Sequence, residues 1–138
     1  MERFLEFAVN HWILVSLFFA LLAALFFVEG RRAGRRIGPQ EVVQLLNRDE
    51  AVVVDVRERK EFSEGHIKGS IHIPLSAVKE RASELKKHEG KQIVLVDKAG
   101  QHTSHAGKLL QAEGIGNVAR LSGGIMDWRG ANLPLTKK

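Results

Sequence analysis

The sequence predicts a small α/β domain with a mainly parallel central sheet, preceded by one membrane-spanning helix. Two observations lead to this fold class. The segment from Phe7 to Val28 contains no charged side chain. After residue 38, short apolar runs typical of buried strands alternate with segments whose apolar residues recur at helical spacing. Strands that alternate with helices are typical of a parallel sheet covered by helices.

The uncharged segment is long enough to cross a bilayer. At about 1.5 Å per residue, a helix over residues 7–28 extends about 33 Å, whereas the hydrocarbon core of a membrane is about 30 Å thick. A cleaved signal peptide and a buried core helix are the alternatives. The start Met1-Glu2-Arg3 is not basic overall, and the apolar run ends at Val28 and Glu29 without a small-residue cleavage site. We therefore expect residues 1–29 to form a single transmembrane helix.

Basic residues after the apolar run predict the orientation of this helix. The chain has four of them, namely Arg31, Arg32, Arg35 and Arg36. On the other side, Arg3 is offset by Glu2 and Glu6. The positive-inside rule then places the N-terminus outside and the C-terminal domain in the cytoplasm. We expect residues 30–37 to be a basic juxtamembrane linker, which serves either as a topology signal alone or also as a contact to anionic headgroups.

Small residues recur along the predicted transmembrane helix. Ser16, Ala20 and Ala24 are four positions apart and share one helix face. A face of this kind permits close packing against a second membrane helix. The pattern leaves two alternatives open, an association of helices through this face and a face that contacts only lipid.

The domain begins with a helix and a buried strand. Pro39 suits the first position of a helix, and the apolar residues of 42–46 follow at helical spacing. Residues 51–55 are a short apolar run and predict a buried parallel strand. Residues 58–62 predict a short helix, and residues 70–73 predict a second strand, which Pro74 ends.

The second half of the domain repeats this alternation. Residues 76–88 predict a helix with Ser76 as its N-cap, because Val78, Ala82 and Leu85 lie on one face. Residues 93–96 predict a strand, residues 103–112 predict a helix closed at Gly114, and residues 118–121 predict the last strand. Residues 38–138 thus form one predicted domain.

Charge and cysteine content exclude several functions. The net charge of +5 divides into +2 for residues 1–38 (five Arg, three Glu) and +3 for residues 39–138 (sixteen Lys and Arg, thirteen Asp and Glu). The charges are interspersed and form no basic stripe with aromatic residues, so we do not expect nucleic-acid binding. The chain contains no cysteine. Disulfides, thiolate metal ligands and thiol catalysis are therefore excluded.

Two long motifs resemble those of the rhodanese-like domain family. Residues 55–74 contain Asp55, Arg57, Gly65 and His66 in the order of the first family signature. Residues 121–134 resemble the closing motif, with Gly123, Gly124 and Trp128. The resemblance extends over about residues 37–138 and implies an α/β sheet fold. It also implies a small protein anchored in the inner membrane of a bacterium, because membrane-anchored members have the same arrangement.

The resemblance places an aspartate where the family has its nucleophile. Rhodaneses have a cysteine at the end of the strand over 93–96, and this position is Asp97. The loop that follows is Lys98, Ala99, Gly100, Gln101 and His102, a pseudo-active-site loop. Backbone amides converge between such a strand end and the following helix and favour an anion. We therefore expect the carboxylate of Asp97 to occupy these amides itself and to repel anionic substrates.

Three other roles for Asp97 remain as alternatives. An aspartyl-phosphate enzyme would need a magnesium site, commonly from a carboxylate two residues later, and residue 99 is alanine. A metal site would combine Asp97 with His102 and His105, although the two histidines suit exposed positions at a helix start. Acid–base catalysis by Asp97 and His102 lacks any recognisable substrate site. We expect no cofactor and no metal.

The signature residues have structural roles in this interpretation. We expect Asp55 and Arg57 to have a conformational or ion-pairing role near the loop, and we expect His66 and Trp128 to pack in the interior. Gly123 and Gly124 are expected to adopt positive φ in a tight turn. The sequence thus predicts a catalytically inactive, membrane-anchored interaction module whose partner is another protein, with integral membrane proteins among the candidates. The alternative is an accessory of sulfur transfer that docks a persulfide-carrying partner.

Overall fold

The structure is a computed structural model that describes residues 2–137; within this range the side chains of residue 8 and of residues 29–33 are not described. The chain divides into two compact units, Met1–Arg31 and Arg32–Lys138. Helix α1 (Glu2–Ala33) makes up the first unit and continues two residues beyond it.

Helix α1 is long and apolar enough to span a membrane. Its segment Glu2–Val28 has 27 residues, and a stretch of 18 residues within it has a mean hydropathy of 2.4. Large apolar side chains along it are exposed, with Trp12 at 72% and Phe26 at 69%. A helix that is apolar on all sides is typical of a membrane span.

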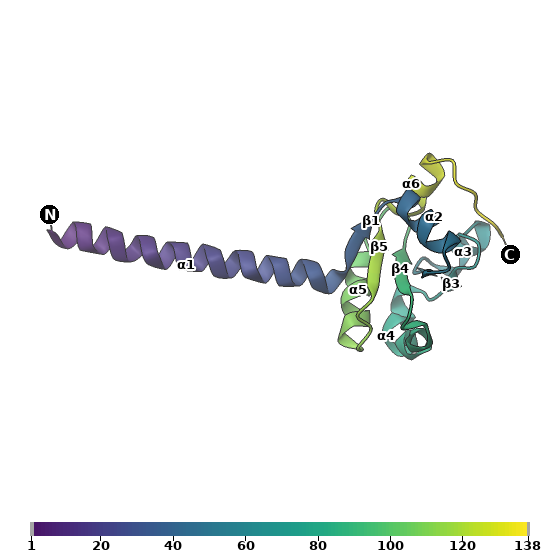
Figure 1. Ribbon diagram of the computed structural model, residues 1–138, viewed down its shortest axis with the longest axis horizontal. Coiled ribbons are helices and arrows are strands. Elements are labelled where there is room, and N and C mark those ends of the chain that lie inside the picture. The colour runs from purple at the N-terminus through teal and green to yellow at the C-terminus, as the bar shows by residue number, and fades with distance from the viewer. Residues whose placement is uncertain (1, 138) are drawn as a thin grey trace. The chain divides into compact units, whose positions relative to one another are not determined.

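The second unit is built on one parallel sheet. Its strands follow the spatial order β1-β5-β4-β2-β3, and every pairing is parallel. The strands are β1 (Arg35–Ile37), β2 (Ala51–Asp55), β3 (Ile71–His72), β4 (Gln92–Val96) and β5 (Val118–Leu121). The α/β fold with a parallel sheet, as predicted from the sequence, is confirmed. Strand β4 lies in the centre, between β2 and β5 (Figure 1).

Helices cover both faces of the sheet (Figure 1). One layer consists of η1 (Leu75–Ala77), α4 (Val78–Arg81), η2 (Ala82–His88) and α5 (Thr103–Ala112), and the other of α2 (Pro39–Asn47), α3 (Arg59–Glu64) and α6 (Gly124–Gly130). Strand β4 shows why two cores result: Ile93 and Leu95 pack under α4 and α5, whereas Val94 and Val96 pack under α2 and α6. Successive strand residues point to opposite faces, so an apolar run serves both cores.

The predicted elements differ from the structure in three places. Most of residues 30–37, which the sequence assigned to a linker, has regular structure, because α1 continues to Ala33 and β1 pairs with β5. The helix predicted over residues 76–88 is divided into η1, α4 and η2, and the side chain of Ser76 caps none of them. The sequence predicted no bounds for helix α6, which begins at Gly124 directly after the turn.

Candidate functional site

The Asp97 loop leaves the carboxyl end of the central strand. Strand β4 ends at Val96 and α5 begins at Thr103, so residues 97–102 connect a strand end to a helix N-terminus. Ligands of open α/β sheets bind at this edge, where loops from neighbouring strands meet. The predicted site is therefore at the expected place in the fold.

The carboxylate of Asp97 accepts hydrogen bonds from its own loop. The amide of Gly100 donates to Oδ1, and the amide of His102 donates to Oδ2 over 2.6 Å. Asp97 is only 2% exposed. Gly100 has φ of +87°, a conformation that favours glycine. A side chain at this position would also be crowded, because its Cβ would lie 3.1 Å from the backbone nitrogen of Gly123. The predicted contact between Asp97 and the loop amides is thus present.

The Gly123–Gly124 turn supports the same loop from the other side. Ile125 N–H donates to the carbonyl of Asp97 over 2.8 Å, and Met126 N–H donates to that of Lys98 over 3.0 Å. Gly123 and Gly124 have φ of +74° and +61°, which confirms the predicted positive φ. A Cβ on Gly124 would lie 2.4 Å from the oxygen of Asp97, so only glycine permits this approach. The closing motif and the loop thus form one backbone unit.

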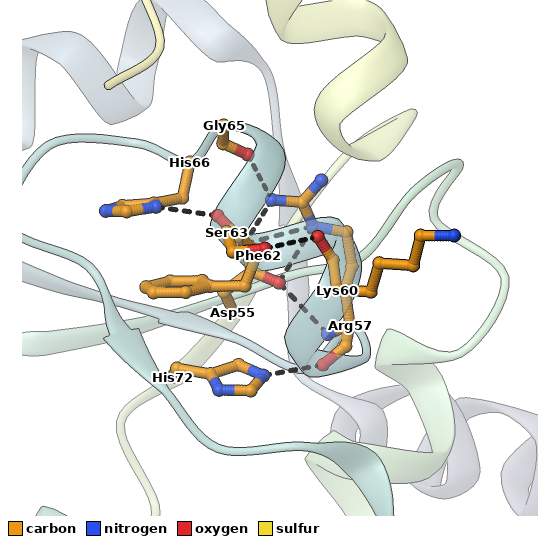
Figure 2. Close-up of polar contacts among 8 residues, drawn as sticks. All are labelled: Asp55, Arg57, Lys60, Phe62, Ser63, Gly65, His66 and His72. Carbon is orange, nitrogen blue, oxygen red and sulfur yellow. Dashed lines mark hydrogen bonds and ion pairs between the residues drawn. The ribbon is translucent and has the colours of Figure 1, made fainter. Parts of the chain in front are cut away.

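Asp55 and Arg57 form a buried ion pair beside the loop. Nε of Arg57 donates to both carboxylate oxygens at 3.0 Å, and Nη2 donates to Oδ2 at 2.8 Å. Nη2 also donates to the carbonyl of Gly65 at 2.6 Å (Figure 2). The side chains are 1% and 5% exposed. Asp55 pairs in register with Val96, so the predicted ion pair lies next to the strand end that carries Asp97.

His66 belongs to a stack of three rings. The ring of Phe62 lies against His66 at 3.8 Å and against His72 at 4.6 Å between centroids. Nδ1 of His66 donates to the carbonyl of Phe62 over 2.8 Å, and Nε2 of His72 donates to that of Arg57 over 2.8 Å (Figure 2). His66 is 3% exposed. The stack holds the segment between β2 and β3, so His66 has the structural role that the sequence predicted.

Trp128 connects α6 to the C-terminal segment. Its side chain is 3% exposed, and its Nε1–H donates to the carbonyl of Pro134 over 2.9 Å. The prediction of a core aromatic at this position is confirmed. Trp128 therefore holds α6, whose first turn supports the Asp97 loop, against the C-terminal segment.

A pocket of about 420 Å³ opens at the Asp97 loop. The segments that follow β2, β3 and β4 line it, and they include residues of α3 and η1. Its lining residues are Val56, Arg57, Glu58, Glu61, Pro74, Leu75, Ser76, Asp97, Lys98, Ala99, Gln101 and His102. The sequence did not identify the contributions of Glu58, Glu61 and Leu75. The order of the strands, which places β2 beside β4, is the information that would have found them.

A second hollow of about 410 Å³ lies next to this pocket and shares Arg57, Glu61 and Lys98 with it. Met126 lines the second hollow and is 59% exposed. Within the part of the domain that the structure describes, Met126 is the large apolar residue whose side chain is exposed. Lys60 and Arg129 add positive charge around it, and Glu64 adds negative charge. An apolar residue with a charged rim suits contact with a protein.

The alternative metal site is not assembled. Among the side chains that the structure describes, no three of His, Cys, Asp or Glu gather in a way that could hold a metal ion. Asp97 and His102 meet through the backbone amide of His102. Each oxygen of Asp97 accepts one amide donor from its own loop.

Comparison with known proteins agrees with the fold. The rhodanese-like domain family matches residues 38–131. The uncharacterised protein YibN of Escherichia coli K12 is 34% identical over 141 residues, which cover 99% of each chain. YrkF of Bacillus subtilis 168, named as a candidate sulfur carrier protein, is 34% identical over 88 residues, 63% of this chain and 46% of its own. A rhodanese-related protein of Thermoplasma volcanium has a crystal structure with a TM-score of 0.68 and 27% identity, over 75% of this chain and 99% of that one.

Proposed function

The chain belongs to the rhodanese-like domain family, and on that premise we propose that it is a catalytically inactive member, anchored in a bacterial inner membrane, whose domain binds another protein. Integral membrane proteins are among the partners we propose, because α1 would keep the domain at the bilayer where they lie. Helix α1 is the anchor, with its N-terminus outside and the domain in the cytoplasm.

The contact of Asp97 with its own loop carries this proposal. A rhodanese uses a cysteine at this strand end, with loop amides that hold a sulfur anion, and this chain has no cysteine. The amides of Gly100 and His102 already face the Asp97 carboxylate. The carboxylate therefore takes the place that a thiolate or an anionic substrate would need.

Electrostatic repulsion adds to this occupation. An anion about 4 Å from the carboxylate would be repelled by about 4 kcal/mol at an effective dielectric constant near 20. This free energy corresponds to roughly a thousandfold loss of affinity. Thiosulfate and similar substrates are thus excluded by charge as well as by the missing nucleophile.

The surface around Met126 supports a role in protein binding. Its exposed side chain lies in a hollow with Lys60, Lys98 and Arg129. Apolar anchors with a charged rim are typical of interfaces, in which the anchor supplies free energy and the rim supplies orientation. We assign the proposed partner to this surface, beside the Asp97 loop.

Helix α1 and the basic residues after it support the proposed anchorage. The helix has the length and composition of a single span. Arg31, Arg32, Arg35 and Arg36 follow the apolar segment and favour the cytoplasm under the positive-inside rule. The face of Ser16, Ala20 and Ala24 offers a second, intramembrane contact for a partner that is itself a membrane protein.

The second candidate function is an accessory of sulfur transfer, and the name of the relative YrkF favours it. In this role the domain would dock a partner that carries a persulfide on its own cysteine. Both functions need a docking surface, but only the accessory needs that surface to admit a sulfur-bearing side chain to the Asp97 loop.

Sulfurtransferase assays test the proposed inactivity. We expect no thiosulfate:cyanide sulfurtransferase activity from the full-length protein. Asp97→Ala is the matched variant, because it removes the repelling charge without adding a nucleophile and is expected to remain inactive. Activity of the wild-type protein above that of Asp97→Ala would contradict the proposal.

Crosslinking in intact membranes, followed by mass spectrometry, tests the partner. We expect crosslinks from the surface around Met126, and we expect Met126→Asp to reduce them. Ser83→Asp is the control, because it adds the same charge at an exposed position in the opposite helix layer. Loss of the crosslinks in Asp97→Ala, with retention in Met126→Asp, would favour the sulfur-transfer accessory instead.

A further inference from the structure

Two arginines lie side by side at one edge of the sheet. Arg36 of β1 and Arg120 of β5 are partners in the parallel register. Paired strands are about 4.8 Å apart, and residues in register point to the same face. Val118, two residues before Arg120, packs in the core under α4 and α5, whereas Leu121 packs under α2 and α6. The two guanidinium groups therefore extend from the face that α5 covers.

No acid that the structure describes balances the positive charge of this pair. Among the described side chains, which exclude residue 8 and residues 29–33, none of the ion pairs involves Arg36 or Arg120. Burial, and after it the charge on Arg36, lowers the pKa of Arg120. Arg35 differs, because it points to the other face and its Nη2 donates to Glu41 over 2.7 Å. Neighbouring arginines on one strand thus have opposite electrostatic surroundings.

A backbone contact orients Arg120. Its Nε–H donates to the carbonyl of Gly34 over 3.2 Å, which leaves its two Nη groups for another acceptor. Gly34 has φ of +93°, and a Cβ there would lie 2.8 Å from the carbonyl oxygen of Val118. Only glycine suits this turn, and the turn presents the carbonyl that holds Arg120. Such a guanidinium is prepared to bind an oxyanion with two parallel hydrogen bonds.

We propose that Arg36 and Arg120 together bind one phosphate group of an anionic phospholipid. The site rests on the proposed membrane anchorage, because Arg36 follows the last residue of α1 by only three positions in the chain. The phosphodiester of an anionic phospholipid presents the oxygens that the two guanidinium groups need, and it lacks the headgroup cation that neutralises the phosphate of phosphatidylcholine. The lipid headgroup, and not free phosphate, is the source because the chain itself would hold the site close to the bilayer.

Nuclear magnetic resonance of the full chain in nanodiscs tests this site. The arginine Nε–H signals are followed in phosphatidylcholine discs as phosphatidylglycerol is added. We expect saturable shifts for Arg36 and Arg120 and none for Arg35. Arg36→Gln is expected to weaken the apparent affinity about fivefold. Arg36→Lys keeps the charge but cannot donate two parallel hydrogen bonds to one phosphate, so we expect the apparent affinity to fall roughly threefold.

Arg35→Lys is the matched control, one residue along the same strand, and its apparent affinity should equal that of the wild type. A loss as large as that of Arg36→Lys would overturn the site in favour of general attraction to a charged surface. No shift with phosphatidylglycerol, in a chain that is inserted in the discs, would overturn the site and leave the proposed anchorage intact. A chain that does not enter phosphatidylcholine discs would overturn the anchorage and the site with it. Equal shifts from inorganic phosphate in discs without phosphatidylglycerol would overturn the assignment to a lipid.

Discussion

The guanidinium of Arg57 holds both carboxylate oxygens of Asp55 in the interior of the domain, with three hydrogen bonds of 2.8 to 3.0 Å. The same guanidinium donates to the carbonyl of Gly65. The pair therefore joins the end of β2 to the C-terminal end of α3. A buried pair adds little free energy compared with apolar residues of similar volume, but the loss of one partner leaves an uncompensated charge.

Arg57→Ala is expected to lower the free energy of unfolding by about 3–5 kcal/mol, because Asp55 would remain buried without its partner. Urea unfolding of the full chain in nanodiscs measures this change, with Trp128 fluorescence as the probe in a Trp12→Phe background. Arg35→Ala removes an exposed ion pair and should cost less than about 1 kcal/mol. If both variants lost the same free energy of unfolding, burial of the Asp55–Arg57 pair would not increase the cost of removing one partner.

Asp97→Asn is expected to open the loop locally. In the wild type, the amides of Gly100 and His102 each donate to a different carboxylate oxygen of Asp97. Asparagine has only one side-chain oxygen, so one of these two hydrogen bonds is lost. Loss of a charge-assisted hydrogen bond costs about 1.5–3 kcal/mol. Hydrogen exchange at the amides of Gly100 and His102 should accelerate by about 10- to 150-fold, as this free energy implies. Asp127→Asn, at an exposed position of α6, is the control; similar acceleration there would contradict the assigned contact.

Gly124→Ala is expected to destabilise the domain strongly. The new Cβ would lie 2.4 Å from the carbonyl oxygen of Asp97, and φ at this residue is +61°. A left-handed conformation costs a non-glycine residue about 1–2 kcal/mol, and overpacking adds about 1–3 kcal/mol. Gly116→Ala is the matched control, because no atom lies within 4 Å of a Cβ there. The geometry at Gly124 would be contradicted if the urea unfolding midpoints of Gly124→Ala and Gly116→Ala agreed within the error of the measurement.

Glu84 offers a pH-dependent test. Hydrogen bonds from Arg81, at 3.1 Å to each carboxylate oxygen, lower the pKa of Glu84 below its ordinary value. Since the folded pKa is below that of the unfolded chain, the pair stabilises the fold at neutral pH, and this contribution is lost as pH falls through the folded pKa. Carbon NMR titration of Glu84 should show a higher pKa in Arg81→Gln than in the wild type. Lys79→Gln, an exposed change in the same helix, should leave it unaltered; no difference for Arg81→Gln would refute the pairing.

The sequence predicted the strands that are buried on both faces. Residues 51–55 and 93–96 are continuous apolar runs, and burial on two faces requires this pattern. Strand β1 lacks the signal, since it has only three residues and two are arginine. Its conformation comes from pairing with β5, more than eighty positions later in the chain. Pairing at such a distance leaves no local pattern in the sequence.

Helical spacing was equally informative within limits. Val78, Ala82 and Leu85 do face the core, but this spacing does not distinguish one α-helix from a short α-helix followed by a 3₁₀-helix. Helix α6 begins at a glycine, and its first amides donate to Asp97 and Lys98 instead of to a side-chain cap. Only the folded chain brings these acceptors to the helix N-terminus.

The contact at Asp97 was predictable in kind and not in detail. A carboxylate between a strand end and a helix N-terminus is expected to find amide donors. Which amides donate depends on the turn at Gly100, and the support from Ile125 and Met126 depends on the packing of α6. The pocket walls from the segments after β2 and β3 follow from the strand order, which no local pattern encodes.

The anion that occupies the amides of Gly100 and His102 is covalently part of the chain. The effective concentration of this carboxylate at the amides is therefore fixed by the chain that connects them and does not depend on anion concentrations in the cell. A soluble anion would have to compete with an occupant that never diffuses away, so the loop keeps the same conformation whether sulfur compounds are abundant or scarce. Under the proposed function, a surface that includes this loop would keep one conformation, and its occupancy would depend on the abundance of the proposed partner.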